Sequence, residues 1–202
     1  HGRALPDVRT GYYDSTDPEV LRRQARLAKR HGLYAFGFIV DAADAGHDSV
    51  RTLATWIAHP DIAFHFVAAL AVPAEDCTED LIAILGRALA DPRCLRVDGR
   101  SMLLVRTHAA SAVASLRGRL EAVAGPFLLV AWVPSGESFE HAPLGAEALI
   151  QGPKDAQKQD HSSYAVLAAR GITDIASSPV GTMPRYPLIS VGTDGDAVTA
   201  GG

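Results

Sequence analysis

Carboxylates follow several of the apolar runs in this sequence, at the positions where parallel strands would end. The runs at 33–40, 63–72 and 126–133 each have acidic residues within a few positions of their last residue. In α/β proteins, ligands bind at the C-terminal ends of the strands. Two carboxylates ~5–10 Å apart can act there as a general acid with a base or nucleophile, as glycoside hydrolysis requires. The candidate catalytic residues are Asp41, Glu75, Asp76 and Glu137.

Aromatic and polar side chains near the same strand ends could hold a carbohydrate. Sugar sites commonly present an aromatic platform beside their carboxylates, and aromatic residues make up only 6% of this chain. Trp132 lies near the end of a predicted strand, where both barrel packing and a role as a ligand platform stay open. Tyr12 and Tyr13 lie in a loop before the first predicted helix. The candidate substrate-binding residues are Tyr12, Tyr13, Asp44, Arg106, His108 and Trp132.

The same residues also have structural interpretations. Asp41, Asp44, Glu75 and Asp76 precede predicted helices, where a carboxylate caps the N-terminus or complements the helix dipole. The eight histidines are scattered and form no metal-binding motif, so we expect neither a metal nor a cofactor. The two cysteines make no C-x-x-C pair, and we expect free thiols.

The elements that must position these residues alternate between helices and apolar strands. The first helix is expected to begin after Thr16 or Asp17 and to end at His31-Gly32, where glycine permits the left-handed turn. A tight turn is expected at 97–100. Further helices are predicted at 48–59, 79–90, 109–124 and 162–170. Strands are predicted at 33–40, 63–72, 101–106, 126–133, 147–151, 172–176 and 186–191, with Pro187 marking a strand start or an edge.

Alternating helices and strands predict an α/β fold with a parallel sheet and right-handed crossovers. A (β/α)8-like, TIM-type barrel and an open doubly wound sheet both fit this pattern. The barrel would be incomplete or truncated, because a full one usually needs ~250 residues. The open sheet usually carries a glycine-rich phosphate loop, and no such motif occurs here. We expect one domain over residues 1–191 and a flexible tail over 192–202.

Composition and charge argue against nucleic-acid binding and against a transmembrane segment. The chain has 202 residues, 48% apolar and 21% charged, with a formal net charge of −4. The basic cluster at 22–30 has the spacing of a solvated helix face, so we expect no nucleic-acid partner. No run approaches the ~20 apolar residues of a transmembrane helix, and no signal-peptide pattern is visible. We therefore expect a cytoplasmic protein without a transmembrane segment.

Several motifs resemble the WbsX-type, glycoside hydrolase family 99-like domain. The residues that carry the resemblance are Gly11-Tyr12-Tyr13-Asp14, Asp17-Pro18-Glu19-Val20-Leu21, His31-Gly32-Leu33-Tyr34-Ala35-Phe36-Gly37-Phe38 and Asp91-Pro92-Arg93-Cys94-Leu95-Arg96-Val97-Asp98-Gly99-Arg100. Such domains occur with bacterial O-antigen, capsule and other polysaccharide biosynthesis genes. The resemblance implies a (β/α)8-like barrel that acts on or binds carbohydrate, with further partner domains where the chain is part of a longer protein.

The sequence differs from that family at the motif that carries the family's catalytic residues. The family has the signature W-A-N-E-N-W where this chain reads Leu70-Ala71-Val72-Pro73-Ala74-Glu75, so its catalytic residues do not carry over. Two hypotheses from different classes follow. One is a divergent carbohydrate-active enzyme that uses the candidate acids. The other is a non-catalytic domain on the same scaffold that binds a glycan or a protein. A nucleotide-dependent open-sheet enzyme is a third, disfavoured because no phosphate loop occurs.

Overall fold

The computed structural model describes residues 14–41, 43, 45–71, 76–105, 110–133, 146–151 and 185–187. The helices are α1 (Pro18–Arg30), α2 (Asp48–Ala58), α3 (Glu79–Ala90) and α4 (Ala110–Ala124). The strands are β1 (Ala35–Val40), β2 (His65–Leu70), β3 (Arg96–Val97), β4 (Arg100–Val105), β5 (Phe127–Val133), β6 (Ala148–Gln151) and β7 (Arg185–Pro187). The predictions at 162–170, 172–176, 188–191 and 192–202 lie outside the described residues.

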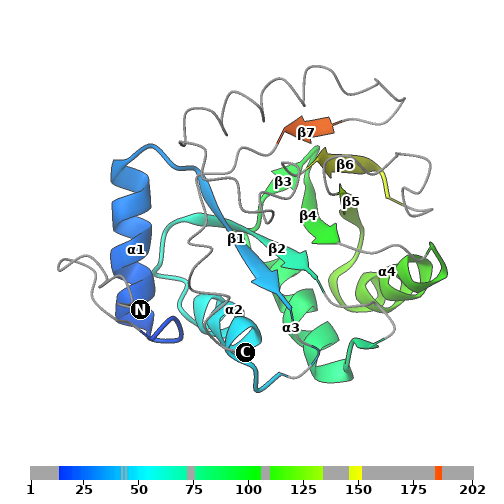
Figure 1. Ribbon diagram of the computed structural model, residues 1–202, viewed down its shortest axis with the longest axis horizontal. Coiled ribbons are helices and arrows are strands. Elements are labelled where there is room, and N and C mark those ends of the chain that lie inside the picture. The colour runs from blue at the N-terminus through cyan, green and yellow to red at the C-terminus, as the bar shows by residue number, and fades with distance from the viewer. Residues whose placement is uncertain are drawn as a thin grey trace, which may run out of the picture.

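The strands form one sheet that winds in a single direction. Its order is β1-β2-β4-β5-β6-β7, every neighbouring pair on this path is parallel, and β3 pairs with β4 as an antiparallel hairpin. A doubly wound sheet reverses its strand order at a switch point, and this order never reverses. Figure 1 shows the four helices following one another along one side of the sheet. The predicted α/β class is therefore confirmed, and the winding is that of a partial TIM-like barrel.

The two faces of the sheet have different neighbours, because side chains alternate along each strand. All four helices bury their apolar side chains against one face, in a cluster that includes Trp56, Phe66, Leu103 and Leu129. The opposite face, which corresponds to the interior of a barrel, holds a second apolar cluster of Val67, Ala69, Met102, Leu104, Leu128, Val130 and Ala148. Both faces of the central strands are thus apolar, which explains the continuous apolar runs in the sequence.

Local chemistry sets the boundaries of the first helix and of the hairpin. Asp17 caps α1 by accepting the N–H of Glu19 at 2.9 Å, and Gly32 follows the helix with a φ of 74°. Pattern reasoning missed the short strand β3, although it placed a tight turn at its end. Asp98 and Gly99 have φ values of 50° and 78°, the left-handed pair that a two-residue hairpin requires.

The Arg93 side chain connects several segments at the N-terminal ends of the strands. Its guanidinium donates to the carbonyl oxygens of Trp56 (2.9 Å), His59 (2.8 Å) and Ile62 (3.1 Å), at the end of α2 and in the lead to β2. It also holds the Asp91 carboxylate through two bonds of 3.0 and 2.6 Å, with side-chain exposures of only 11% and 7%. One side chain thereby satisfies the carbonyls of two segments and the acid that follows α3.

Replacing Arg93 with alanine should strongly destabilise the protein. The change leaves the Asp91 carboxylate buried without its partner, which typically costs about 3–5 kcal/mol. Urea unfolding of the wild type and Arg93→Ala measures this loss. Arg87→Ala, which removes an exposed arginine of α3, is the control and should change stability by at most about 0.5 kcal/mol. An equal effect of both substitutions would contradict the role given to Arg93.

Stability should also depend on pH through Asp91. Burial raises the pKa of its carboxyl, but hydrogen bonds from the Arg93 side chain and backbone outweigh burial and lower the pKa below its ordinary value of 3.8. The ionised form is therefore favoured by folding, and its contribution is present above the unfolded-state pKa and lost as pH falls through the folded-state pKa. The stability difference between wild type and Asp91→Asn should stay constant from about pH 7 to 5 and shrink below about pH 4. A difference that is unchanged by acid in urea titrations would refute this assignment.

Candidate functional site

The C-terminal ends of the parallel strands face the N-termini of α2 and α3, as the predicted site requires. Asp41 directly follows β1, Asp76 lies between β2 and α3, and Trp132 lies near the end of β5. These three are the predicted site residues that fall within the described part of the chain. The others lie outside it: Tyr12, Tyr13, Asp44, Glu75, Arg106, His108 and Glu137. The convergence of several acids on one cleft therefore stays a prediction.

Asp41 lies in a small polar cluster at the start of α2. Its Oδ1 is 3.5 Å from His47 Nδ1, and its backbone N–H donates to Ser49 Oγ at 3.5 Å. His47 is the N-cap of α2, since its Nδ1 accepts the backbone N–H of Ser49 at 3.3 Å. The Asp41 side chain is 59% exposed, so a ligand that approaches this edge from solvent can reach its carboxylate.

The trio of Asp41, His47 and Ser49 does not have the geometry of a hydrolytic triad. In a triad the acid holds one ring nitrogen and the serine hydroxyl contacts the other. Here the carboxylate, the hydroxyl (3.1 Å) and the helix N–H all meet Nδ1. Because Nδ1 accepts the N–H of Ser49, the neutral ring carries its proton on Nε2. The cluster therefore fixes the start of α2 and leaves the Asp41 carboxylate available for other contacts.

Asp76 lies in the loop before α3, and the side chains of Thr78 and Arg119 hold this loop in place through hydrogen bonds. Thr78 caps α3 by accepting the N–H of Leu81 at 3.3 Å, and it donates its own hydroxyl proton to the Ala43 carbonyl at 2.9 Å. Arg119 of α4 reaches the same loop and donates to the Cys77 carbonyl at 2.8 Å and to Glu79 at 2.7 Å. These contacts hold the loops after β1 and β2 together, with the exposed Asp76 beside them.

Two of the structural interpretations need correction. Neither Asp41 nor Asp76 is a helix N-cap: His47 caps α2 and Thr78 caps α3. Pattern reasoning missed both caps, although Thr78 followed by Glu79 and Asp80 is a readable helix start. His47 gave a weaker signal, because histidine is not among the preferred N-cap residues.

Trp132 lies on the barrel-interior face of the sheet. It is half-buried and packs against the second apolar cluster, while Phe127 and Leu129 of the same strand turn toward the helices. Trp132 is the penultimate residue of β5 and pairs with Ile150 of β6. It therefore lies near the C-terminal ends of the strands, as does Asp41, which directly follows β1. The Trp132 indole is partly exposed on this face, close to the strand ends.

Metal binding, cysteine reactivity and membrane-spanning helices can also be assessed for the described residues. No group of three or more His, Cys, Asp or Glu side chains gathers there as a metal site would. Both cysteines are buried, and burial raises the pKa of the Cys94 thiol to about 11, which disfavours a thiolate. No helix in that part of the chain is long and apolar enough to cross a membrane.

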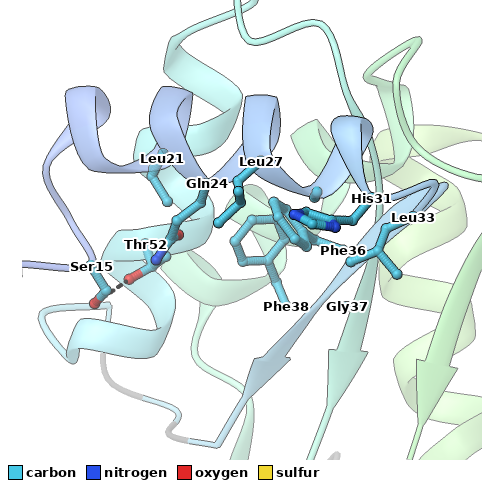
Figure 2. Close-up of a pocket in the computed structure, with 11 residues that line it drawn as sticks. Ser15, Leu21, Gln24, Leu27, His31, Leu33, Phe36, Gly37, Phe38 and Thr52 are labelled. Carbon is cyan, nitrogen blue, oxygen red and sulfur yellow. Dashed lines mark hydrogen bonds between the residues drawn. The ribbon is translucent and has the colours of Figure 1, made fainter. Parts of the chain in front are cut away.

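A cavity of about 560 Å³ lies between α1 and β1, on the helix-covered side of the sheet. Its lining includes Leu21, Leu27, Phe36 and Phe38, shown in Figure 2. None of the three described site residues borders it. The cavity and the strand-end site are therefore separate features of the surface.

Comparison with known proteins gives a fold assignment. No protein-family model matches the chain, and no curated protein matches it significantly. Among solved structures, one described as a "Glycoside hydrolase-like protein" superposes with a TM-score of 0.58 at 12% sequence identity. The match covers 94% of this chain and 67% of that one. The chain therefore has a glycoside hydrolase-like fold.

Removing the Thr78 hydroxyl should loosen the edge that carries Asp41 and Asp76. Thr78→Ala loses both the cap of α3 and the bond to the Ala43 carbonyl, and we expect a cost of about 1–2 kcal/mol in chemical unfolding. Thr78→Ser keeps a hydroxyl in place and should retain most of the stability. Equal destabilisation by the two substitutions would mean that the threonine methyl, not the hydroxyl, matters.

Proposed function

We propose that this chain is a carbohydrate-active domain that engages a glycan at the C-terminal ends of its parallel strands. The observation that carries the proposal is Trp132, a partly exposed indole on the barrel-interior face near those ends. The fold supports it, because its structural neighbour is described as glycoside hydrolase-like. The WbsX-type resemblance of the sequence adds a finer proposal, in which the glycan belongs to a bacterial surface polysaccharide such as O-antigen or capsule.

The roles of the residues follow from their positions. The Trp132 ring offers its face to a sugar ring, and apolar stacking of this kind needs no fixed hydrogen-bond pattern. Asp41 supplies a carboxylate that can accept hydrogen bonds from sugar hydroxyls or act in acid–base catalysis. Hydrolysis needs a second carboxylate ~5–10 Å away, and Asp76, Glu75 and Glu137 are the candidates that the sequence offers.

A non-catalytic glycan-binding domain is the second candidate. Two observations favour it over an enzyme: the family's W-A-N-E-N-W signature is replaced at 70–75, and the described acids Asp41 and Asp76 are both exposed to solvent. A general acid usually sits in a partly desolvated pocket that tunes its proton affinity. Binding and turnover must therefore be measured separately.

Binding of the 202-residue chain to an array of bacterial surface polysaccharides tests the shared part of both candidates. We expect Trp132→Ala to weaken the best interaction about tenfold, which corresponds to about 1.4 kcal/mol of lost contact. Trp132→Phe keeps a ring and should retain part of the affinity. Val123→Ala, on the exposed surface of α4, is the control and should bind as the wild type does. Unchanged binding by Trp132→Ala, with its fold verified by circular dichroism, would exclude this site.

Asp41→Asn separates the enzyme from the binding domain. If Asp41 acts in catalysis, the substitution should lower glycan turnover by about 10²–10⁴ while affinity stays within a few-fold. If the domain only binds, the wild type should release no reducing ends from the bound glycan over prolonged incubation. Reducing-end detection and affinity measurement on the same samples distinguish the two.

A further inference from the structure

Within the described part of the chain, the first strand of the sheet has one edge without a pairing strand, called here its free edge. β1 pairs with β2 in register from Ala35 with His65 to Val40 with Leu70, and the Val40 carbonyl accepts the N–H of Ala71 at 2.8 Å. Backbone groups alternate between the two edges of a strand, so Val40, Phe38 and Phe36 face β2. The N–H and C=O groups of Ala35, Gly37 and Ile39 consequently face the other edge, where no strand among the described residues pairs with them.

Two of the features that usually protect an edge strand, a charged side chain and a proline, are missing from β1. The sequence of β1, Ala-Phe-Gly-Phe-Ile-Val, contains no charge and no proline. Apolar side chains are also exposed around it: Leu27 is 45% exposed, Leu33 52%, Tyr34 69% and Ile39 49%. Within the described chain, Val123 on α4 is the other large apolar side chain that is exposed to this degree. Exposed apolar surface beside an unpaired strand edge is typical of an interaction site.

A groove runs beside the free edge. The cavity between α1 and β1 has a volume of about 560 Å³. Figure 2 shows Leu27 of α1 and Phe36 and Phe38 of β1 gathered around it, with the Ser15–Thr52 hydrogen bond of 3.2 Å at one end. The backbone of Gly37, between the two phenylalanines, also lines it. The groove is therefore an apolar space that opens at the edge of the sheet.

We propose that the free edge of β1 and this groove bind one extended polypeptide segment with apolar side chains at alternate positions. The segment's backbone would pair with Ala35, Gly37 and Ile39, and every second side chain would enter the groove beneath α1. This is strand addition, in which main-chain bonds supply affinity and side-chain pockets supply selectivity.

Charge favours such a segment over a second copy of this chain. Antiparallel pairing of two β1 edges continues the sheet and brings the two α1 helices to the same face, next to each other. In each α1, Arg22 is paired with Glu19 and with Asp61 outside the helix, while the exposed side chains of Arg26, Lys29 and Arg30 leave the last turns of the helix positively charged. Like charges on adjacent helices oppose that dimer, whereas an extended segment with acidic flanks complements them.

Hydrogen exchange of the 202-residue chain with a synthetic peptide, Asp-Thr-Leu-Thr-Val-Thr-Leu-Glu, tests the proposal. Without peptide, the amides of Ala35, Gly37 and Ile39 should exchange rapidly, while those of Phe36, Phe38 and Val40 are protected by β2. Millimolar peptide should slow the first three at least tenfold. A control peptide with proline in place of its central valine should have no such effect.

Three variants sharpen the test. Gly37→Pro removes a donor that faces the free edge and should weaken peptide binding at least tenfold, whereas the β1–β2 ladder stays protected. Leu27→Gln changes the groove and should weaken binding, while Val123→Gln makes the same change on α4 and should not. The proposal is overturned if millimolar peptide protects none of the three amides, or if Gly37→Pro binds as tightly as the wild type. It is also overturned if the free chain is a dimer in which these amides are already protected.

Discussion

The Arg93 guanidinium is the constraint on which the arrangement of the described chain depends. It gathers the end of α2, the lead into β2 and the acid after α3 at one edge of the sheet, and its own carbonyl accepts the N–H of Phe66 in β2. The arginine also lies 5.8 Å from the centre of the Trp56 ring, so polar and apolar packing coincide there. With the N-terminal edge fixed, helices of similar length return each strand in the same direction. The C-terminal ends of the strands, with the candidate site residues that follow them, therefore lie together on the side of the sheet opposite Arg93.

Much of this fold could be predicted from sequence because its signals are local. The helix α1 has a cap, an N-terminal proline and a stop at Gly32, and the apolar runs mark strands that are buried on both faces. The order of the strands in the sheet could not be predicted from local sequence signals, because the barrel and the open sheet have the same alternation of helices and strands. What separates them is the direction of winding, which packing decides. The hydrogen bonds of Arg93 to backbone carbonyls could not be predicted either, because the three partner residues lie more than 30 positions away in the chain.

The site was harder to predict for a physical reason. An acid after a strand can cap a helix, pair with a base or face a ligand, and the choice depends on side chains that fold in from elsewhere. At α2 that side chain is His47, which takes the capping position and leaves the Asp41 carboxylate exposed. Trp132 was placed near a strand end from sequence, but only the alternation within β5 assigns it to the barrel-interior face. The free edge of β1 had no sequence signal, since a central strand and an edge strand with the same apolar run look alike.

The most direct test of the central claim is a crystal structure of the chain with the oligosaccharide that binds most strongly on the array. We expect sugar density at the C-terminal ends of the strands, with a ring stacked on Trp132 and a hydroxyl within hydrogen-bond distance of the Asp41 carboxylate. Density in the groove between α1 and β1, with both residues free of contact, would contradict it. That result would assign carbohydrate to the surface proposed here for an extended polypeptide and would leave the strand ends without a ligand.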